Sequence, residues 1–385
     1  MNRLTTSGAG FELARYPEDP RDPFRAWDAA DEYLLRRLEG ADGTDPVDLS
    51  GAVVVVGDRW GALSTVLAGH RPVQITDSYL AQRATLANLD RNGVAADAVR
   101  LLSARDTPPD RIDVLLVRVP KSLALLEDQL HRLAPAVHPG TVVIGTGMVK
   151  EIHTSTLKLF ERIIGPTRTS LAVKKARLIF STPGPGTART PSPWPYRYDL
   201  PEGLGPVSGR TVTNHAGIFC AERLDIGTRF FLGHLPARSG PDRVLDLGCG
   251  NGVVGLAAAL ANPESAVTFI DESYQAVASA EETFRANTGP DAKAEFLVGD
   301  GPAELSPGSV DLVLNNPPFH SHQATTDATA RTMFHGARTA LRAGGELWVV
   351  GNRHLGYHTR LRRIFGNCVT VAGDPKFVVL RAVKR

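Results

Sequence analysis

The chain has 385 residues, a formal net charge of +2, an apolar fraction of 42% and three cysteines. This length allows two or three domains with buried cores, and no apolar run reaches the roughly 18 residues that indicate a membrane-spanning helix. Neither a secretory signal nor a metal-spaced cysteine cluster is evident. We therefore expect a globular, monomeric protein without a bound metal, located in a reducing cytoplasm.

Charge is distributed unevenly along the chain. Residues 1–50 carry eleven acids and six arginines, whereas residues 353–385 carry eight basic residues and one acid. A basic end on a nearly neutral protein favours a local anionic partner. A solvated helix face and tail would explain the same charges, so the composition alone leaves both interpretations open.

The first half alternates apolar strands with helices. A helix is expected over residues 26–38, where apolar residues recur at helical spacing. The expected strands are 53–56, 73–77, 112–119, 141–144, 170–173 and 177–180. The expected helices are a short one after Gly61 and the segments 78–92, 123–133 and 156–164. This alternation is typical of a parallel, doubly wound sheet.

Residues 181–212 interrupt the alternation with closely spaced prolines and glycines, which oppose regular structure. The pattern then starts again, with strands expected at 244–247, 267–270, 296–298, 310–314, 346–350, 369–371 and 377–382. Helices are expected at 252–261, 273–287, 328–341 and around residue 361. We therefore predict one domain over residues 1–180, a linker over 181–212 and a second domain over 213–385.

The two halves are one design used twice. VQITDSYLAQRATLANLDRNG in the first half is similar to VTFIDESYQAVASAEETFRAN in the second, and RIDVLLVRVPKS is similar to SVDLVLNNPPFH. Such self-similarity indicates a tandem duplication. The predicted fold class is α/β, with two tandem Rossmann-like domains.

A glycine-rich turn follows the first strand of the second copy. Gly248, Gly250 and Gly252 stand in Gly-x-Gly-x-Gly spacing, and glycines let a backbone turn tightly and approach a ligand. Asp271, at the tip of the next strand, can accept from both hydroxyls of a ribose. This much would also suit NAD.

Three features favour S-adenosylmethionine over NAD as the cofactor. Asp246 precedes the first glycine by two residues, where a carboxylate can meet the cationic amino-acid end of that ligand. Asp300 ends a third strand, where it can accept from the adenine amine. The glycine spacing also lacks the Gly-x-Gly-x-x-Gly form that is typical of a pyrophosphate site.

The segment Asn316-Pro317-Pro318-Phe319 follows the strand 310–314, at the sheet edge where open α/β folds bind ligands. The side-chain carbonyl of Asn316 and the proline carbonyls can accept hydrogens from an amine, and Phe319 supplies a flat apolar face. This catalytic segment suits a nucleobase with an exocyclic amine, and Asn316 would also border the cofactor. A Pro-Pro turn with an Asn cap is the alternative.

Together these motifs resemble the class I methyltransferases that modify exocyclic amines, and within them the two-domain bacterial rRNA guanine-N2 methyltransferases. Residues 214–219 and 224–231 are similar to that family's lead-in to its catalytic domain, and residues 315–320 to its catalytic loop. The large-subunit (23S) enzymes are the nearer likeness, and the small-subunit (16S) enzymes share the architecture. The resemblance implies methylation of a guanine 2-amino group in rRNA, with a degenerate first domain and a catalytic second domain.

The first copy keeps the scaffold and loses the site. Arg59 and Trp60 replace glycine-loop residues, and Arg118 and Lys121 stand in the place of the catalytic segment. We therefore predict that the first domain binds RNA through Arg118 and Lys121, and that it does not bind the cofactor. The further predicted RNA contacts are His320, Arg353 and Arg360. Surface charge or a loop cap without a role in binding is the alternative for these side chains.

Two other functions remain open at this point. Asn-Pro-Pro-Phe also occurs in enzymes that methylate adenine in DNA and glutamine in proteins, although the paired domains and the basic end favour a large nucleic acid. A non-catalytic rRNA assembly factor is an alternative from a different class, and the intact second glycine loop argues against it.

Overall fold

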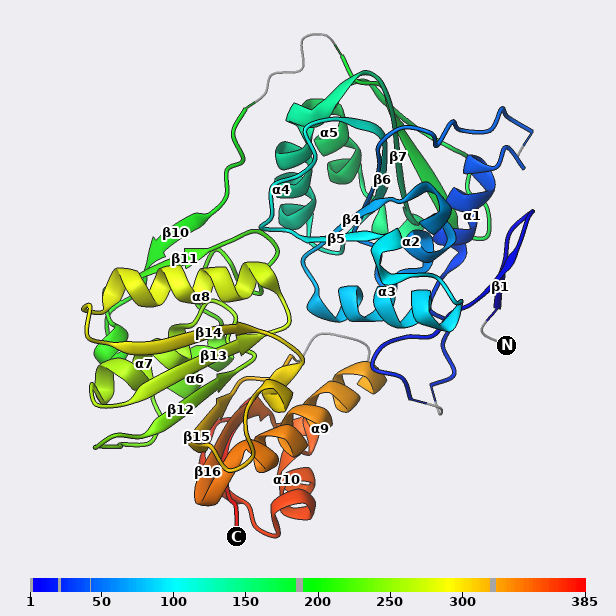
Figure 1. Cartoon of the computed structure of the whole chain (residues 1–385). Coiled ribbons are helices and arrows are strands. Elements are labelled where there is room, and N and C mark those ends of the chain that lie inside the picture. The colour runs from blue at the N-terminus through cyan, green and yellow to red at the C-terminus, as the bar shows by residue number, and fades with distance from the viewer. Residues whose placement is uncertain (1–2, 20–21, 42, 185–189, 319–322) are drawn as a thin grey trace. The chain divides into compact units, whose positions relative to one another are not determined.

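The computed structural model describes residues 3–19, 22–41, 43–184, 190–318 and 323–385, and for residues 323–328 the backbone alone. The chain forms two compact units, Met1–Trp194 and Pro195–Arg385 (Figure 1). Each unit contains one seven-stranded sheet with helices on both faces. This arrangement confirms the predicted α/β fold with two Rossmann-like domains.

The first unit is built on a sheet with the strand order β5-β4-β3-β6-β7-β9-β8. Its strands are β3 (Val53–Val56), β4 (Val73–Thr76), β5 (Arg100–Ser103), β6 (Ile112–Arg118), β7 (Val137–Met148), β8 (Thr167–Thr169) and β9 (Ala176–Ser181). Its helices are α1 (Ala29–Leu38), α2 (Ala62–Val66), α3 (Tyr79–Arg91), α4 (Leu123–Leu133) and α5 (Thr154–Ile163). A small hairpin of β1 (Arg3–Thr5) and β2 (Gly10–Glu12) precedes them.

The second unit repeats this design with the strand order β14-β13-β12-β15-β16-β18-β17. Its strands are β12 (Arg243–Leu247), β13 (Ala266–Asp271), β14 (Lys293–Val298), β15 (Val310–Asn315), β16 (Leu341–Asn352), β17 (Val369–Gly373) and β18 (Phe377–Val383). Its helices are α6 (Ile226–Leu232), α7 (Val253–Ala261), α8 (Tyr274–Asn287), α9 (Gln323–Ala340) and α10 (Tyr357–Phe365).

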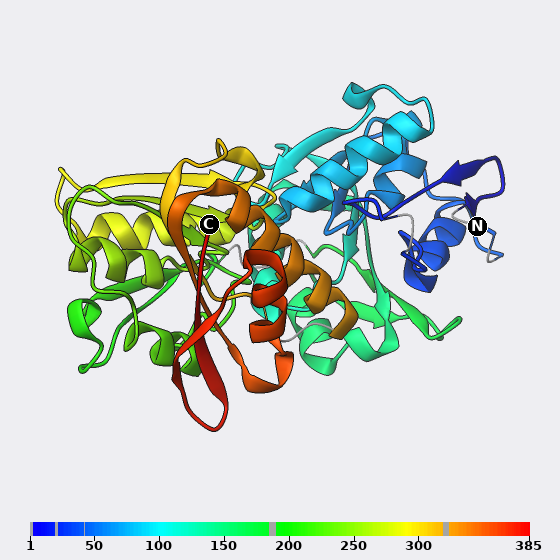
Figure 2. The same cartoon turned by 90° about the horizontal axis from the view of Figure 1, so that it is seen from below.

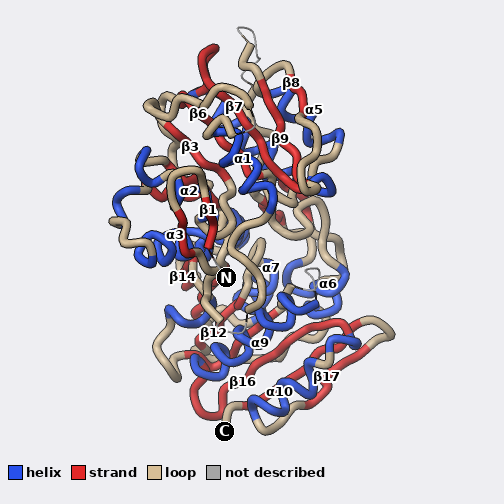
Figure 3. The backbone as a smooth tube through the Cα atoms, turned by 90° about the vertical axis from the view of Figure 1, so that its right-hand side faces the viewer, coloured by secondary structure: helices blue, strands red, loops and turns tan. Residues whose placement is uncertain are grey.

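The core of the second unit lies on both faces of its sheet. Apolar residues of α7 and α8 pack with Leu312 and Leu314 on one face, and those of α9 and α10 pack with Val313 and Val349 on the other. Figure 2 shows these two helix pairs on opposite sides of the strands. Helix α10 also packs against α9 and β18 (Figure 3). Burial on both faces explains why the central strands are continuous apolar runs.

Strand register aligns the two copies residue by residue. In the first unit Val56 pairs with Val117, and in the second Leu247 pairs with Asn315. The next residue along the chain is Arg118, the last residue of β6, in the first unit and Asn316, directly after β15, in the second. These two side chains therefore occupy equivalent positions at the carboxyl edges of their sheets, as the sequence alignment predicted.

The structure differs from the predicted linker, 181–212. Strand β10 (Tyr196–Asp199) pairs with β11 (Thr211–Asn214), and the chain between them contributes Leu200, Leu204 and Val207 to the core of the second unit. The division between the two units falls at Trp194. The second half of the predicted linker is therefore part of the second unit.

Candidate active site

The glycine loop joins β12 to α7 in a left-handed backbone conformation. Gly248, Gly250 and Gly252 have φ angles of 71°, 53° and 77°, values that L side chains rarely adopt. A Cβ at Gly252 would lie 2.8 Å from the Cα of Ala280, whereas a Cβ at Gly250 would meet nothing within 4 Å. The last glycine therefore serves helix packing, and the middle one faces open space that a ligand can use.

Asp271 lies across from this loop at the end of β13. Its Oδ2 accepts from the Gly250 amide at 3.0 Å, and its Oδ1 accepts from the Ser273 amide at 3.0 Å. Burial raises the pKa of Asp271. Each carboxylate oxygen has a further lone pair, so the side chain can hold the loop and still accept from two neighbouring hydroxyls.

Asp246 is buried beneath the glycine loop. Its Oδ2 accepts from the Gly255 amide in the first turn of α7 at 2.8 Å, and the residue is 3% exposed. Burial raises the pKa of Asp246 to about 8, and the nearby charge of Asp271 adds to the rise. The carboxyl group thus anchors α7, and its contact with the cationic end of the cofactor stays a prediction.

Asp300 follows β14 at the same edge of the sheet. It is half-buried, and burial followed by the charge of Glu304 raises its pKa. The structure therefore places Asp246, Asp271 and Asp300 on or just after three neighbouring strands, β12, β13 and β14. Hydrogen bonding of Asp300 to an adenine amine stays a prediction.

The catalytic segment begins where β15 ends. Asn315 is fully buried, and its Nδ2 donates to the Leu247 carbonyl at 2.7 Å, which ties the end of β15 to the start of the glycine loop. Asn316 donates from its Nδ2 to the Thr228 Oγ1 at 2.9 Å. Its Oδ1 is buried and has no hydrogen-bond partner among the described residues. An acceptor thus remains available beside the glycine loop.

The rest of the catalytic segment is only partly described. Pro317 is buried and Pro318 is exposed. The predictions for Phe319 and His320 fall outside the described residues. The catalytic roles predicted for Asn316, Pro317, Pro318 and Phe319 stay predictions.

Sequence reasoning missed the contacts of the segment that precedes β12. Asp225 caps α6 by accepting from the Thr228 amide at 2.8 Å, and Thr228 then contacts Asn316. The spacing Asp-x-x-Thr is a helix-cap signal. It predicts the cap, but not the asparagine, which lies 88 residues further along the chain.

The prediction that Arg118 contacts RNA is wrong. The Arg118 side chain is 1% exposed, and three carboxylates surround its guanidinium. Nη2 lies 2.6 Å from Asp28 Oδ2, Nη1 lies 3.0 Å from Glu151 Oε2, and Nε lies 3.3 Å from Asp31 Oδ1. A buried and fully paired cation has no face left for a phosphate.

The same cluster occupies the first copy's counterpart of the active site. Arg59, which replaces the middle glycine of the loop, lies 3.0 Å from Glu151 and 3.9 Å from Asp28. Glu151 has a pKa lowered to about 2; burial opposes this shift, and the charges of Arg118 and Arg59 outweigh it. Side chains of the first unit thus fill the position that is open at Gly250 in the second.

Three other predicted RNA contacts, Lys121, Arg353 and Arg360, lie within the described residues and reach the surface. Lys121 and Arg353 are exposed, and Arg360 is half-buried, with its guanidinium 5.8 Å from the centre of the Tyr357 ring. Arg353 directly follows β16, which pairs with β15, so it lies at the same sheet edge as Asn316. Contact of these residues with RNA stays a prediction.

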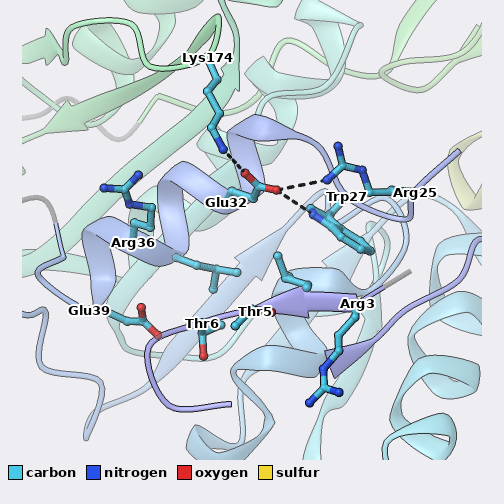
Figure 4. Close-up of a pocket in the computed structure, with 11 residues that line it drawn as sticks. Arg3, Thr5, Thr6, Arg25, Trp27, Glu32, Arg36, Glu39 and Lys174 are labelled. Atoms are coloured by element: carbon cyan, nitrogen blue, oxygen red, sulfur yellow. Dashed lines mark hydrogen bonds and ion pairs between the residues drawn. The ribbon is translucent and has the colours of Figure 1, made fainter. Parts of the chain in front are cut away.

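A separate hollow of about 340 Å³ lies between α1 and β1 in the first unit. Glu32 is at its centre and contacts Lys174 Nζ at 3.1 Å, Arg25 Nη1 at 3.5 Å and the Trp27 indole nitrogen at 3.1 Å (Figure 4). The hollow contains no glycine loop, and two of its lining cations, Arg25 and Lys174, are paired with Glu32. It therefore lacks the features of a cofactor site.

Two further findings concern the described residues. Within them, no group of three or more His, Cys, Asp or Glu side chains is placed to hold a metal ion. No helix there is long and apolar enough to cross a membrane.

Two family models match the chain. The RLMG N-terminal domain matches residues 1–185, and the methyltransferase small domain matches residues 209–381. The first match covers the unit that contains the Arg118 cluster, and the second covers the unit that contains the glycine loop and Asn316.

Curated relatives match over the full length. The ribosomal RNA large subunit methyltransferase G of Streptomyces griseus is 81% identical over 385 residues, and that of Stutzerimonas stutzeri is 48% identical, each covering 100% of both chains. Among solved structures, the T. thermophilus 16S rRNA N2 methyltransferase in complex with AdoMet and guanosine has a TM-score of 0.74. It is 21% identical and covers 100% of this chain and 97% of its own, which shows a shared fold. On the strength of its full-length curated relatives, the chain belongs to the ribosomal RNA large subunit methyltransferase G family.

Proposed function

We propose that this protein transfers a methyl group from S-adenosylmethionine to the exocyclic 2-amino group of a guanine in 23S rRNA. The observation that carries the proposal is the buried Oδ1 of Asn316, which has no hydrogen-bond partner among the described residues and lies at the end of the strand next to the glycine loop. The names of the full-length relatives support ribosomal RNA of the large subunit as the substrate.

The residues at the sheet edge fit S-adenosylmethionine. Gly250 leaves open space in which the ligand can lie against the loop, and the oxygens of Asp271 retain lone pairs for ribose hydroxyls. Asp300 supplies a half-buried acceptor for the adenine amine. When bound, S-adenosylmethionine supplies an electrophilic methyl group on a sulfonium.

The protein's own part in the reaction is to position the amine. The lone pair of the guanine 2-amino group is delocalised into the ring, which makes it a weak nucleophile. Asn316 Oδ1 and the Pro317 carbonyl accept the two amine hydrogens, and so direct the nitrogen lone pair towards the methyl group. No strong base is needed before transfer, because the amine proton becomes acidic only as the new C–N bond forms and the methyl–sulfur bond breaks; the proton then leaves to water.

The target nucleotide must leave its helix to reach this site. A guanine that is paired and stacked cannot present its amine to a sheet edge, so it is flipped out or already unstacked. Phe319 is proposed to stack on the base, and His320 to contact the base or a phosphate. Lys121, Arg353 and Arg360 are proposed to hold the neighbouring phosphates.

The first unit is proposed to bind RNA rather than the cofactor. The Arg118 cluster supports the second half of this statement, because Arg59 and its ion pair with Glu151 occupy the counterpart of the cofactor space. The proposal includes a monomeric protein that acts in the cytoplasm, where rRNA is made in bacteria.

A guanine of 16S rRNA is the second candidate substrate. The T. thermophilus 16S rRNA N2 methyltransferase has the same fold over its whole length, and the chemistry would be unchanged. A non-catalytic assembly factor fits less well, because the glycine loop and the Asn316 acceptor are both intact.

One experiment separates these possibilities. The purified protein is incubated with S-adenosylmethionine carrying a labelled methyl group and with total RNA from a strain that lacks the gene. The labelled nucleoside is then mapped. We expect N2-methylguanosine in 23S rRNA; label in 16S rRNA would change the substrate, and cofactor binding without label in any RNA would contradict the proposed reaction.

A further inference from the structure

The Asn316 amide is held from one end only. Its nitrogen donates to Thr228 Oγ1, while its oxygen is buried and meets no donor in the described ranges. A buried acceptor without a partner costs roughly 1–3 kcal/mol. The two ends of an amide are similar in shape, so the protein must determine which end faces the target amine.

Hydrogen-bond direction determines the orientation of this amide. Asp225 Oδ2 lies 3.3 Å from Thr228 Oγ1, and an ionised carboxylate can only accept. The single hydroxyl proton of Thr228 therefore points to Asp225. A lone pair of the same oxygen remains for Asn316, and it can accept only from the amide nitrogen.

The backbone around α6 makes this chain of contacts possible. Asp225 is the N-cap and Thr228 lies in the first turn, so both side chains are on one side of the same turn. A Cβ at Gly227 would lie 3.0 Å from Asp225 Oδ2 and 3.1 Å from Phe377 Cε1. Glycine at this position leaves room for the carboxylate between the helix and its neighbours.

We propose that Asp225 and Thr228 are positioning residues that fix the Asn316 amide with its oxygen towards the target amine. The inference rests on the proposed function, because it assigns the origin of the acceptor that the methyl transfer uses. If the amide were reversed, its NH2 group would face the guanine NH2 group. Two donors would then oppose each other, and the lone pair of the substrate nitrogen would lose its orientation.

The test compares three single variants with the wild-type protein. Thr228→Val removes the hydroxyl and keeps the side-chain shape, and it leaves the cap intact because Asp225 also accepts from the backbone amide. Thr228→Ser keeps the hydroxyl. Thr211→Val is the matched control, since it removes a threonine hydroxyl that donates to Asp199 at 2.6 Å in an exposed hydrogen bond between β10 and β11.

The readouts are the single-turnover rate on rRNA, the KM for rRNA and the calorimetric Kd for S-adenosylmethionine. For Thr228→Val we expect a rate at least ~10-fold lower, because the acceptor is lost in only part of the population and the full loss costs about 10²–10³. KM and Kd should stay within about twofold. Thr228→Ser should recover most of the rate, and Thr211→Val should match the wild type.

A double variant separates positioning from general damage to the fold. If Thr228 acts through Asn316, adding Thr228→Val to Asn316→Ala should lower the rate no further. Effects that multiply, or a Thr228→Val variant as fast as the wild type, would overturn this inference alone. A wild-type protein that does not methylate a guanine amine would overturn the proposed function, and this inference with it.

Discussion

At the scale of single residues, a substitution at Asn316 tests the proposed chemistry most directly. Asn316→Ala removes the Oδ1 acceptor, which no described residue engages, and leaves Asp271 and the glycine loop untouched. We expect the single-turnover rate to fall on the order of 10²–10³, by analogy with the loss of one oxyanion-hole donor. Calorimetry should give a nearly unchanged Kd for S-adenosylmethionine. A variant with a normal rate would show that another group orients the amine.

Asp31 predicts an unusual pH dependence in the first unit. Burial raises the pKa of Asp31 to about 7, against the attraction of Arg118, from the ordinary aspartate pKa of 3.8. Between these values the folded state keeps a proton that the unfolded state has lost. The contribution of Asp31 to stability therefore falls as pH rises from about 4 to about 7.

The variant Asp31→Asn isolates this effect, because the amide does not ionise over that range. The Glu151 carboxyl, with its pKa lowered to about 2, contributes the opposite slope only below the ordinary glutamate pKa of 4.5. Urea unfolding of the first unit between pH 5 and 8 should therefore show a smaller loss of stability with rising pH in the variant than in the wild type. Equal slopes in the two proteins would refute the raised pKa.

The wrong prediction for Arg118 shows that the type of a residue does not determine its partners. A cation at a former catalytic position suggests phosphate binding when the sequence is considered alone. Its partners Asp28 and Asp31 lie at the start of α1, about 90 positions earlier in the chain. No local sequence signal indicates that α1 packs at this point. The glycines and Asn316 were predictable because backbone geometry and strand ends constrain them locally.

At the scale of elements, the turn before β9 carries backbone strain. Val173 and Ala176 form an isolated antiparallel bridge, and the two residues between them, Lys174 and Lys175, have φ angles of 48° and 63°. Two-residue turns of this kind prefer Asn-Gly, and a left-handed conformation costs an ordinary residue roughly 1–2 kcal/mol. The ion pair between Lys174 and Glu32 is partly exposed and offsets at most about 1 kcal/mol.

The double substitution Lys174→Asn/Lys175→Gly should therefore stabilise the first unit. A net gain of about 1 kcal/mol corresponds to a rise in Tm of roughly 2–4 °C for a unit of this size. Differential scanning calorimetry measures it directly. Lys174→Ala/Lys175→Ala is the control, since it removes the same charges without relieving the backbone, and an equal rise in Tm there would point to charge rather than strain.

The elements that the sequence predicted correctly and those it missed differ in a physical way. Central strands are covered on both faces of the sheet, so their residues are mostly apolar, as in Val53–Val56. Such continuous apolar runs can be recognised in the sequence. Strand β5 (Arg100–Ser103) was missed, since an edge strand of four residues with two polar ends lacks that signal. The β10–β11 hairpin was assigned to the linker because the adjoining prolines obscured it.

At the scale of the whole molecule, the two units are copies of one fold with different contents at the same sheet edge. Gly250 faces open space in the second unit, whereas Arg59 and Arg118 fill the equivalent region in the first. If the Arg118 guanidinium moved away to make room for a ligand, the three acidic side chains around it would lose the cation that neutralises them. Duplication has thus kept the scaffold in the first unit and replaced its ligand space with ion pairs.

This difference predicts a division of labour that separate expression of the units can test. Residues 1–194 and 195–385 are the pieces to compare, because Leu200, Leu204 and Val207 belong to the second core. The first piece should bind rRNA fragments with an affinity that falls as salt rises, since phosphate contacts release counterions. It should show no heat of binding with S-adenosylmethionine.

The second piece should bind S-adenosylmethionine and methylate rRNA poorly on its own. Its acceptor and glycine loop are complete, but the flipped guanine would lack the anchoring that the first unit is proposed to give. Adding the first piece in trans should restore little activity, because the two sites would no longer be joined at a high effective concentration. If the isolated second piece methylated rRNA as fast as the intact chain, the first unit would have no part in substrate binding, and Lys121 would have to be dropped as an RNA contact.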